Sequence, residues 1–204
     1  IETLDWQTAN DYFRAKFTAL YAGVNRSNAV LSVINGIDRD ALLPNEVAAI
    51  TAQEAEARFL RGHYYFELTK LYGNVSIVSV ENYEALEFNQ PNSGPAWEQI
   101  EADFQFAIEN LPPSRAEQPD PGRPTAFVAR AYMGKAHLYQ GDWANALTEL
   151  NAVINSGEYA LNPEYLDNFN AAGENGPESI FAIQYAADTG QSFNGNIAGT
   201  LNFP

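Results

Sequence analysis

The feature that most constrains the fold of this chain is a pair of helices that occurs twice. In the first helix of the first pair, a glycine stands among apolar residues at steps of four, three and four positions: Ala55, Phe59, Gly62 and Phe66. The same steps recur 72 positions later at Phe127, Ala131, Gly134 and Leu138. Steps of three and four place side chains on one face of a helix, so both segments are predicted to be helices with a small residue in the packing face.

The second helix of each pair repeats as well. Its steps are three, four and three, first at Trp97, Ile100, Phe104 and Ala107 and then, 46 positions later, at Trp143, Ala146, Leu150 and Val153. Because the two offsets differ by 26, the first pair contains an insertion. We therefore predict helix pairs at about 45–112, with the insertion at 74–96, and at 124–157, within one helical repeat domain over 1–204.

The second pair resembles a tetratricopeptide repeat, on the strength of its central glycine and of the turn Gly141-Asp142-Trp143. Helix pairs of this kind cannot bury their apolar face alone and stack into a solenoid. The resemblance implies an all-α fold of tetratricopeptide-like helical repeats, with long irregular loops and one or two short β segments.

Local signals define the remaining elements. Helices are predicted at about 8–34, 45–72, 95–111, 124–140 and 143–155, with glycine or proline at most of their ends. Thr51 and Glu54 have the spacing of a capping box. Short β segments are predicted at 75–78 and 179–183, and loops at 79–94, 113–123 and 186–204.

Charge and composition exclude several classes of function. The 204 residues include 11 Lys and Arg against 26 Asp and Glu, a net charge of −15, so nucleic acid is not an expected partner. After Lys135 there are eight acids and no base. The absence of cysteine excludes a disulfide framework, a thiolate zinc site and a cysteine nucleophile. No run approaches the roughly 18 apolar residues of a membrane span.

Catalytic and metal-binding motifs are scarce. His63 has Glu67 one helical turn later, but a third ligand at helical spacing is missing, and His137 stands at a roughly equivalent place in the second pair. Glu54 with Glu56, or Glu81 with Glu84, could form a glycosidase pair only if they flank a cleft. We therefore predict no metal, no cofactor and no catalytic residue.

Aromatic residues are the one abundant resource for binding, with three Trp, 11 Tyr and 12 Phe. Those at helical spacing are predicted to be core residues: Phe59, Phe66, Trp97, Phe104 and Trp143. Others lie in loop-like sequence beside Asn and Gln: Trp6, Tyr83, Phe88, Tyr185 and Phe193. Sugar rings stack on such aromatic rings while neighbouring amides bind the hydroxyl groups, so these residues are candidates for a glycan site.

The segment Ala55–Val78, AEARFLRGHYYFELTKLYGNVSIV, resembles the most recognisable stretch of the SusD/RagB family of bacterial outer-membrane nutrient-uptake lipoproteins. The resemblance rests on an acidic-Ala-Arg-Phe-Leu-Arg pattern, an aromatic cluster, and Leu-Tyr-Gly before an extended segment. Further similarities follow in the family's order: 20–28, 97–112, 122–125, 143–161 and 178–185. The family often has proline where this chain has Ser76.

The resemblance implies a non-catalytic, surface-exposed glycan-binding protein of the outer membrane that delivers oligosaccharide to a SusC-like TonB-dependent transporter. Family members are longer and lipidated on an N-terminal cysteine, so this chain is expected to be a section of a longer lipoprotein whose anchor lies outside it. The repeats would face the transporter. The glycan would lie between terminal segments, with Trp6 and Asn10 near one edge and Tyr185, Phe193 and Asn194 near the other.

Two alternatives remain open at this point. A tetratricopeptide adaptor would bind peptides of a partner protein in a concave groove, whereas a glycoside hydrolase would need paired carboxylates at a common cleft. The net charge of −15 favours a neutral rather than a polyanionic glycan.

Overall fold

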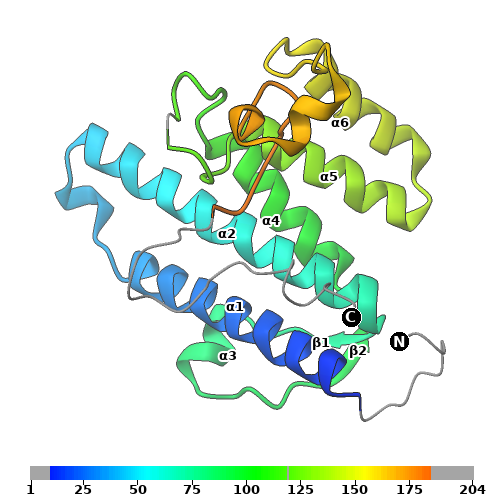
Figure 1. Ribbon diagram of the computed structural model, residues 1–204. Helices are drawn as coiled ribbons and strands as arrows, with labels where there is room; N and C mark the ends of the chain where they lie inside the picture. The colour runs from blue at the N-terminus through cyan, green and yellow to red at the C-terminus, as the bar shows by residue number, and fades with distance from the viewer. Residues whose placement is uncertain (1–9, 119, 185–204) are drawn as a thin grey trace, which may run out of the picture.

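The structure is a computed structural model that describes residues 10–118 and 120–184. Its main elements are long helices in which each packs against the next along the chain (Figure 1): α1 (Asp11–Asn35), α2 (Pro44–Tyr72), α4 (Trp97–Asn110), α5 (Ala126–Gln140) and α6 (Trp143–Asn155). The predicted all-α class is confirmed. A single two-stranded sheet is found among the described residues.

Helix ends follow the local chemistry of the chain. The predicted helix at 143–155 has the bounds of α6, because the Asp142 side chain accepts a hydrogen bond from the Asn145 backbone amide at 3.2 Å. Gly141 ends α5 with a left-handed φ of 77°, which glycine adopts without steric cost. Proline proved a less accurate start signal, since α5 begins two residues after Pro124, where the Thr125 side chain caps the helix.

The predicted capping box at Thr51 is wrong. The Thr51 hydroxyl donates to the Val47 carbonyl at 2.8 Å, in the interior of α2. The reciprocal contact lies at the true start of the helix, where the Glu46 carboxylate accepts from the Leu43 amide at 2.9 Å. Glu54 instead binds two arginines, as described below.

Glycines allow two successive helix pairs to approach closely. A Cβ atom added at Gly62 of α2 would lie 2.8 Å from the Phe104 ring of α4, and one added at Gly134 of α5 would lie 2.8 Å from Leu150 of α6. Both distances are shorter than a van der Waals contact between carbon atoms. The equivalent glycines of the two sequence repeats thus have the same structural consequence, each receiving a large side chain of the following helix.

The insertion at 74–96 is more ordered than the predicted loop at 79–94. It contains β1 (Val75–Ser76), the five-residue helix α3 (Val80–Glu84) and β2 (Asn92–Gly94). The strands pair antiparallel, with Val75 opposite Gly94. The loop prediction failed because a five-residue helix is too short to show an apolar period; the signal it does carry is the Ser79–Asn82 cap.

Polar side chains of α1 and α2 fix the start of the insertion. The Tyr21 hydroxyl donates to the Ser76 carbonyl at 2.9 Å and accepts from the Ser76 amide at 3.0 Å. The buried Tyr65 hydroxyl accepts from the Val78 amide at 2.8 Å, and Asn28 donates to the Val78 carbonyl at 2.8 Å. These bonds satisfy backbone groups that burial would otherwise leave without partners.

Beyond α6 the chain is irregular, with short 3₁₀ turns at Tyr165–Phe169 and Ala171–Gly173. The predicted β segment at 179–183 is wrong, because no strand forms there. Arg115 of the α4–α5 connection instead holds this part of the chain, donating to the carbonyls of Gly176 at 3.2 Å and of Ser179. Phe181 packs its ring against Phe59 at a centroid distance of 5.4 Å.

Candidate functional site

Most of the predicted glycan-contacting residues, namely Trp6, Tyr185, Phe193 and Asn194, lie outside the described residues. Asn10 is described, and its side chain is the N-cap of α1, with the carbonyl oxygen accepting a hydrogen bond from the Tyr12 amide at 2.9 Å. The glycan site predicted between the terminal segments therefore stays a prediction.

Other predicted aromatics separate into core and surface. Phe59, Phe66 and Phe104 are buried as predicted, and Trp97 is partly buried against Phe66. Trp143 is 67% exposed, so its assignment to the core is wrong. The reason is its place in the stack, because α6 is the last of the described helices and its outer face has no neighbouring helix among them.

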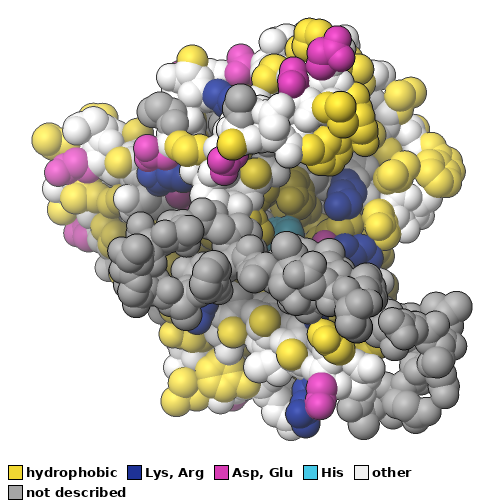
Figure 2. Space-filling model, viewed as in Figure 1, with side chains coloured by type: hydrophobic (Ala, Val, Ile, Leu, Met, Phe, Trp, Pro, Cys, Tyr) yellow, Lys and Arg dark blue, Asp and Glu magenta, His cyan; other side chains and the backbone are white. Residues whose placement is uncertain are grey.

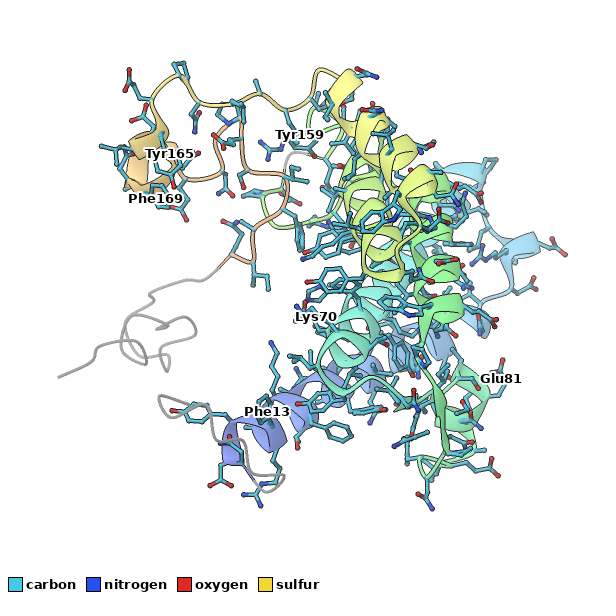
Figure 3. The ribbon with its side chains drawn as sticks, turned by 90° about the vertical axis from the view of Figure 1, so that its right-hand side faces the viewer. Phe13, Lys70, Glu81, Tyr159, Tyr165 and Phe169 are labelled. Atoms are coloured by element: carbon cyan, nitrogen blue, oxygen red, sulfur yellow. The ribbon has the colours of Figure 1, made fainter. Side chains whose placement is uncertain are left out.

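A recess on the face shown in Figure 2 gathers a different set of residues. Lys, Arg and a histidine side chain are visible in its hollowed part, although the chain as a whole is strongly acidic. Six residues that contact His63 or Phe66, or whose charges act on His63, are called the concave cluster: Lys16 of α1, His63, Glu67 and Lys70 of α2, and Tyr132 and Lys135 of α5. Figure 3 shows Lys70 directed into the space between α1 and the irregular segment that carries Tyr165 and Phe169.

Aromatic rings form the support of the concave cluster. The ammonium groups of Lys135 and Lys70 lie 5.2 and 5.6 Å from the centroid of the Phe66 ring. Lys135 is also 5.9 Å from the Tyr132 ring, and the His63 ring lies 5.6 Å from Tyr132. Cations over aromatic faces are attracted by the ring quadrupole, so these rings help to hold the two lysines on the same surface.

Burial and the charges around it both affect the protonation of His63. Burial lowers the pKa of His63, and the charges of Lys16, Lys135 and Lys70 lower this pKa further, against the opposing effect of Glu67. The imidazole is therefore held neutral, and its buried Nδ1 has no hydrogen-bond partner among the described residues. Glu67 accepts a hydrogen bond from Lys70 at 2.6 Å.

A second feature, a cavity of about 160 Å³, lies between the α4–α5 connection and the irregular segment. Its arginines already have partners, since Arg115 binds backbone carbonyls and Arg123 donates two hydrogen bonds to Glu56 at 2.9 and 3.0 Å. Ligand pockets usually have about 300–1,000 Å³. This cavity is too small to receive an oligosaccharide, and its arginines are already bound to other groups of the protein.

Three of the carboxylates considered in the sequence, Glu54, Glu56 and Glu84, bind other side chains of the protein. Glu54 is buried and accepts hydrogen bonds from Arg39 at 2.6 Å and from Arg58 at 2.8 Å, whereas Glu56 binds Arg123. Glu84 accepts from the Ser32 hydroxyl. Across residues 10–118 and 120–184 no group of three or more metal-ligating side chains comes together, and no helix there is long and apolar enough to cross a membrane.

Together, the stacked helix pairs and the close approach at their glycines define a tetratricopeptide-like helical scaffold. Residues 2–138 match the SusD-like family described as starch-binding and associating with the outer membrane. The chain belongs to this SusD-like family, as its sequence resemblance implied.

Relatives and solved structures agree with this assignment. SusD-like protein P2 of Formosa agariphila is 28% identical over 202 residues, which cover 93% of this chain and 38% of that protein. A SusD-like protein of Bacteroides ovatus is 27% identical over a matched region that covers 83% of this chain and 32% of that protein. This chain thus spans only about a third of the length of these relatives.

Among solved structures, a SusD-like carbohydrate-binding protein of Bacteroides fragilis superposes with a TM-score of 0.75 at 26% identity, over 88% of this chain and 34% of that one. A laminarin-binding SusD-like protein superposes with a TM-score of 0.70 at 30% identity, over 82% of this chain and 37% of that one. All four of these proteins are described as SusD-like.

Proposed function

We propose that this chain is the helical-repeat part of a non-catalytic protein that binds oligo- or polysaccharide at the outer cell surface and passes it to a SusC-like TonB-dependent transporter. The observation that carries the proposal is family membership over residues 2–138, joined to the similarity with a laminarin-binding SusD-like protein. In this proposal the stacked helices are the transporter-facing scaffold of a longer lipid-anchored protein, and the terminal segments contribute the glycan site.

Affinity electrophoresis tests glycan binding and the predicted preference for neutral polymers. The protein is run in gels that contain a neutral polysaccharide, such as laminarin or xyloglucan, or a polyanion, such as alginate. We expect retardation by at least one neutral polymer, because the net charge of −15 repels polyanions. Retardation by polyanions alone would contradict the preference, and retardation by no polymer would contradict glycan binding.

The location of the site is tested with two tryptophans. We expect Trp6→Ala to weaken retardation and Trp143→Ala to leave it unchanged, because Trp143 projects from the outer face of α6. Equal effects of both variants would exclude the proposed site between the terminal segments.

Delivery and the absence of catalysis need separate measurements. Co-expression with a SusC-like transporter, followed by affinity purification of the transporter, is expected to recover this protein in a stoichiometric complex. Incubation with a bound oligosaccharide is expected to leave the chain length of the sugar unchanged. Hydrolysis that is lost on replacement of one Glu or Asp would establish a hydrolase instead.

A further inference from the structure

The sign of the charge in the concave cluster is opposite to that of the whole protein. Lys16, Lys70 and Lys135 contribute three positive charges and Glu67 one negative charge, while His63 is neutral. The chain as a whole has a net charge of −15. A local excess of positive charge inside an acidic protein attracts an anionic group over a short range, because screening by salt limits its reach to about 10 Å.

Two of the lysines have no carboxylate partner among residues 10–118 and 120–184. Seven of the 11 Lys and Arg side chains form ion pairs with Asp or Glu among the described residues. Lys70 is one of them, through Glu67, but Lys16 and Lys135 have no carboxylate partner there and both are exposed. In the part of the chain that the structure describes, no carboxylate competes with a ligand for these two charges.

The support of the cluster is suited to a sugar rather than to a bare ion. Tyr132 is partly buried among the His63, Phe59, Phe104 and Phe181 rings, so the part of its ring that stays exposed is held in place beside Lys135. Apolar faces of pyranose rings pack on aromatic side chains, and charged groups at the rim then fix the orientation of the ligand. An aromatic surface with two free ammonium groups matches a sugar that carries a carboxylate.

We propose that the concave cluster binds the carboxylate of a uronic-acid residue on an otherwise neutral oligosaccharide, with Lys16 and Lys135 as the charged contacts and Tyr132 as the aromatic contact. This inference rests on the proposed glycan-binding function, specifies its ligand, and adds a contact on the helices to the site proposed at the terminal segments. The net charge of −15 repels a polyanion. A single carboxylate is attracted by the nearby lysines and brings no further negative charge close to the acidic surface.

A matched pair of ligands tests the proposal by calorimetry on the intact protein. The first ligand is xylotetraose, and the second is the same tetraose with one glucuronic-acid branch. We expect the acidic sugar to bind about fivefold more tightly at low salt, the upper range for a partly exposed ion pair, and the difference to disappear at high salt.

Charge-neutralising variants identify the residues responsible. Lys16→Gln with Lys135→Gln is expected to abolish the preference for the acidic sugar over the neutral one. Glu67→Gln is expected to increase the preference, because it removes the negative charge of the cluster. Arg26→Gln is the control, since Arg26 is exposed on the same helix as Lys16 but ten positions, or about 15 Å, further along.

The outcomes separate this inference from the proposed function. Equal binding of the two sugars, or a preference that survives the double lysine variant, overturns the inference and leaves glycan binding intact. A preference lost equally in Arg26→Gln overturns it as well, because the effect would then be one of net charge. Binding of neither of these sugars overturns the inference, and the proposed function is then decided by the polysaccharide gels. Circular dichroism verifies that each variant is folded.

Discussion

Asp103 accepts two hydrogen bonds from the guanidinium of Arg61, one from Nε at 2.8 Å and one from Nη2 at 2.7 Å, and both side chains are buried. Arg61 also donates to Asn28 of α1 at 2.9 Å, so a single guanidinium joins α1, α2 and α4. Burial alone would lower the pKa of Arg61, but the Asp103 carboxylate outweighs burial and raises it. The Arg61 guanidinium therefore stays charged, whereas burial raises the pKa of the Asp103 carboxyl above its ordinary value despite the hydrogen bonds from Arg61.

Removal of one partner of this pair is expected to destabilise the protein strongly. Arg61→Leu or Asp103→Leu leaves a buried charge without its counter-ion, a change that costs about 3–5 kcal/mol in unfolding free energy. The double variant is expected to lose less than either single variant, because no buried charge remains. Urea denaturation followed by circular dichroism measures all three, and additive losses would show that the two residues do not act as a pair.

The close approach of the helix pairs predicts graded effects of alanine at three glycines. Gly62→Ala should cost about 1–3 kcal/mol, because the new methyl group meets the fully buried Phe104 ring. Gly134→Ala should cost less, since Leu150 is only partly buried and can move aside. Gly36→Ala is the control, with right-handed backbone and its nearest atom at 3.5 Å. Thermal unfolding would contradict this account if the control lost as much as Gly62→Ala.

The exposed Trp143 and the buried Phe104 lie in the second helices of the two repeats, and their removal should affect stability to different extents. Trp143→Ala should change the unfolding free energy by less than about 1 kcal/mol, as is usual for surface positions. Phe104→Ala should cost about 3–5 kcal/mol, because it opens a cavity in the core. Comparable losses in the two variants, measured by urea denaturation, would mean that another part of the protein covers Trp143.

Glu54 predicts a loss of stability in acid. Burial tends to raise its pKa, but the hydrogen bonds and charges of Arg39 and Arg58 outweigh burial and lower it below the ordinary value of 4.5. The unfolded chain therefore takes up a proton at higher pH than the folded one. The stabilisation is complete above pH 4.5 and is lost as the pH falls through the folded pKa.

Unfolding of the wild type and of Glu54→Gln is compared between neutral pH and pH 3. We expect the variant to be less stable at neutral pH by about 1–3 kcal/mol and to show a weaker dependence on pH. Glu174→Gln, an exposed position of the irregular segment, is the control and should keep the wild-type dependence. An unchanged pH profile in Glu54→Gln would mean that other carboxylates dominate.

The helices could be predicted from the sequence because their signals are local. Asp142 and Gly157 bracket α6, and the apolar steps between them need no knowledge of the rest of the chain. The short α3 has no such period, and its cap at Ser79 was the only local sign of it. Trp143 was misassigned because spacing gives the face of a residue on its helix but not whether another helix covers that face.

The concave cluster could not be predicted, because its charged residues come from α1, α2 and α5. Lys16, Lys70 and Lys135 are separated by 54 and 65 positions, and only the packing of the helices brings them to one surface. The sequence did single out His63 with Glu67, but as an incomplete metal site. Lys70 lies three residues after Glu67 on the same helix, so the spacing of the two residues could have added it to this pair.

The pairing of Val75 with Gly94 has a consequence for how this fold can vary. The two ends of the insertion meet at this ladder, and Tyr21, Asn28 and Tyr65 fix the first of them to the helices. Between these strands α3 is fixed as well, because Val80 is buried with Leu31 of α1 and Glu84 accepts a hydrogen bond from Ser32. The exposed residues 85–89, which connect α3 to β2 and include Leu86, have no such role. Because loop length adds little to the free energy of closing a loop, this short stretch can be lengthened or replaced by an epitope without altering the spacing of α2 and α4.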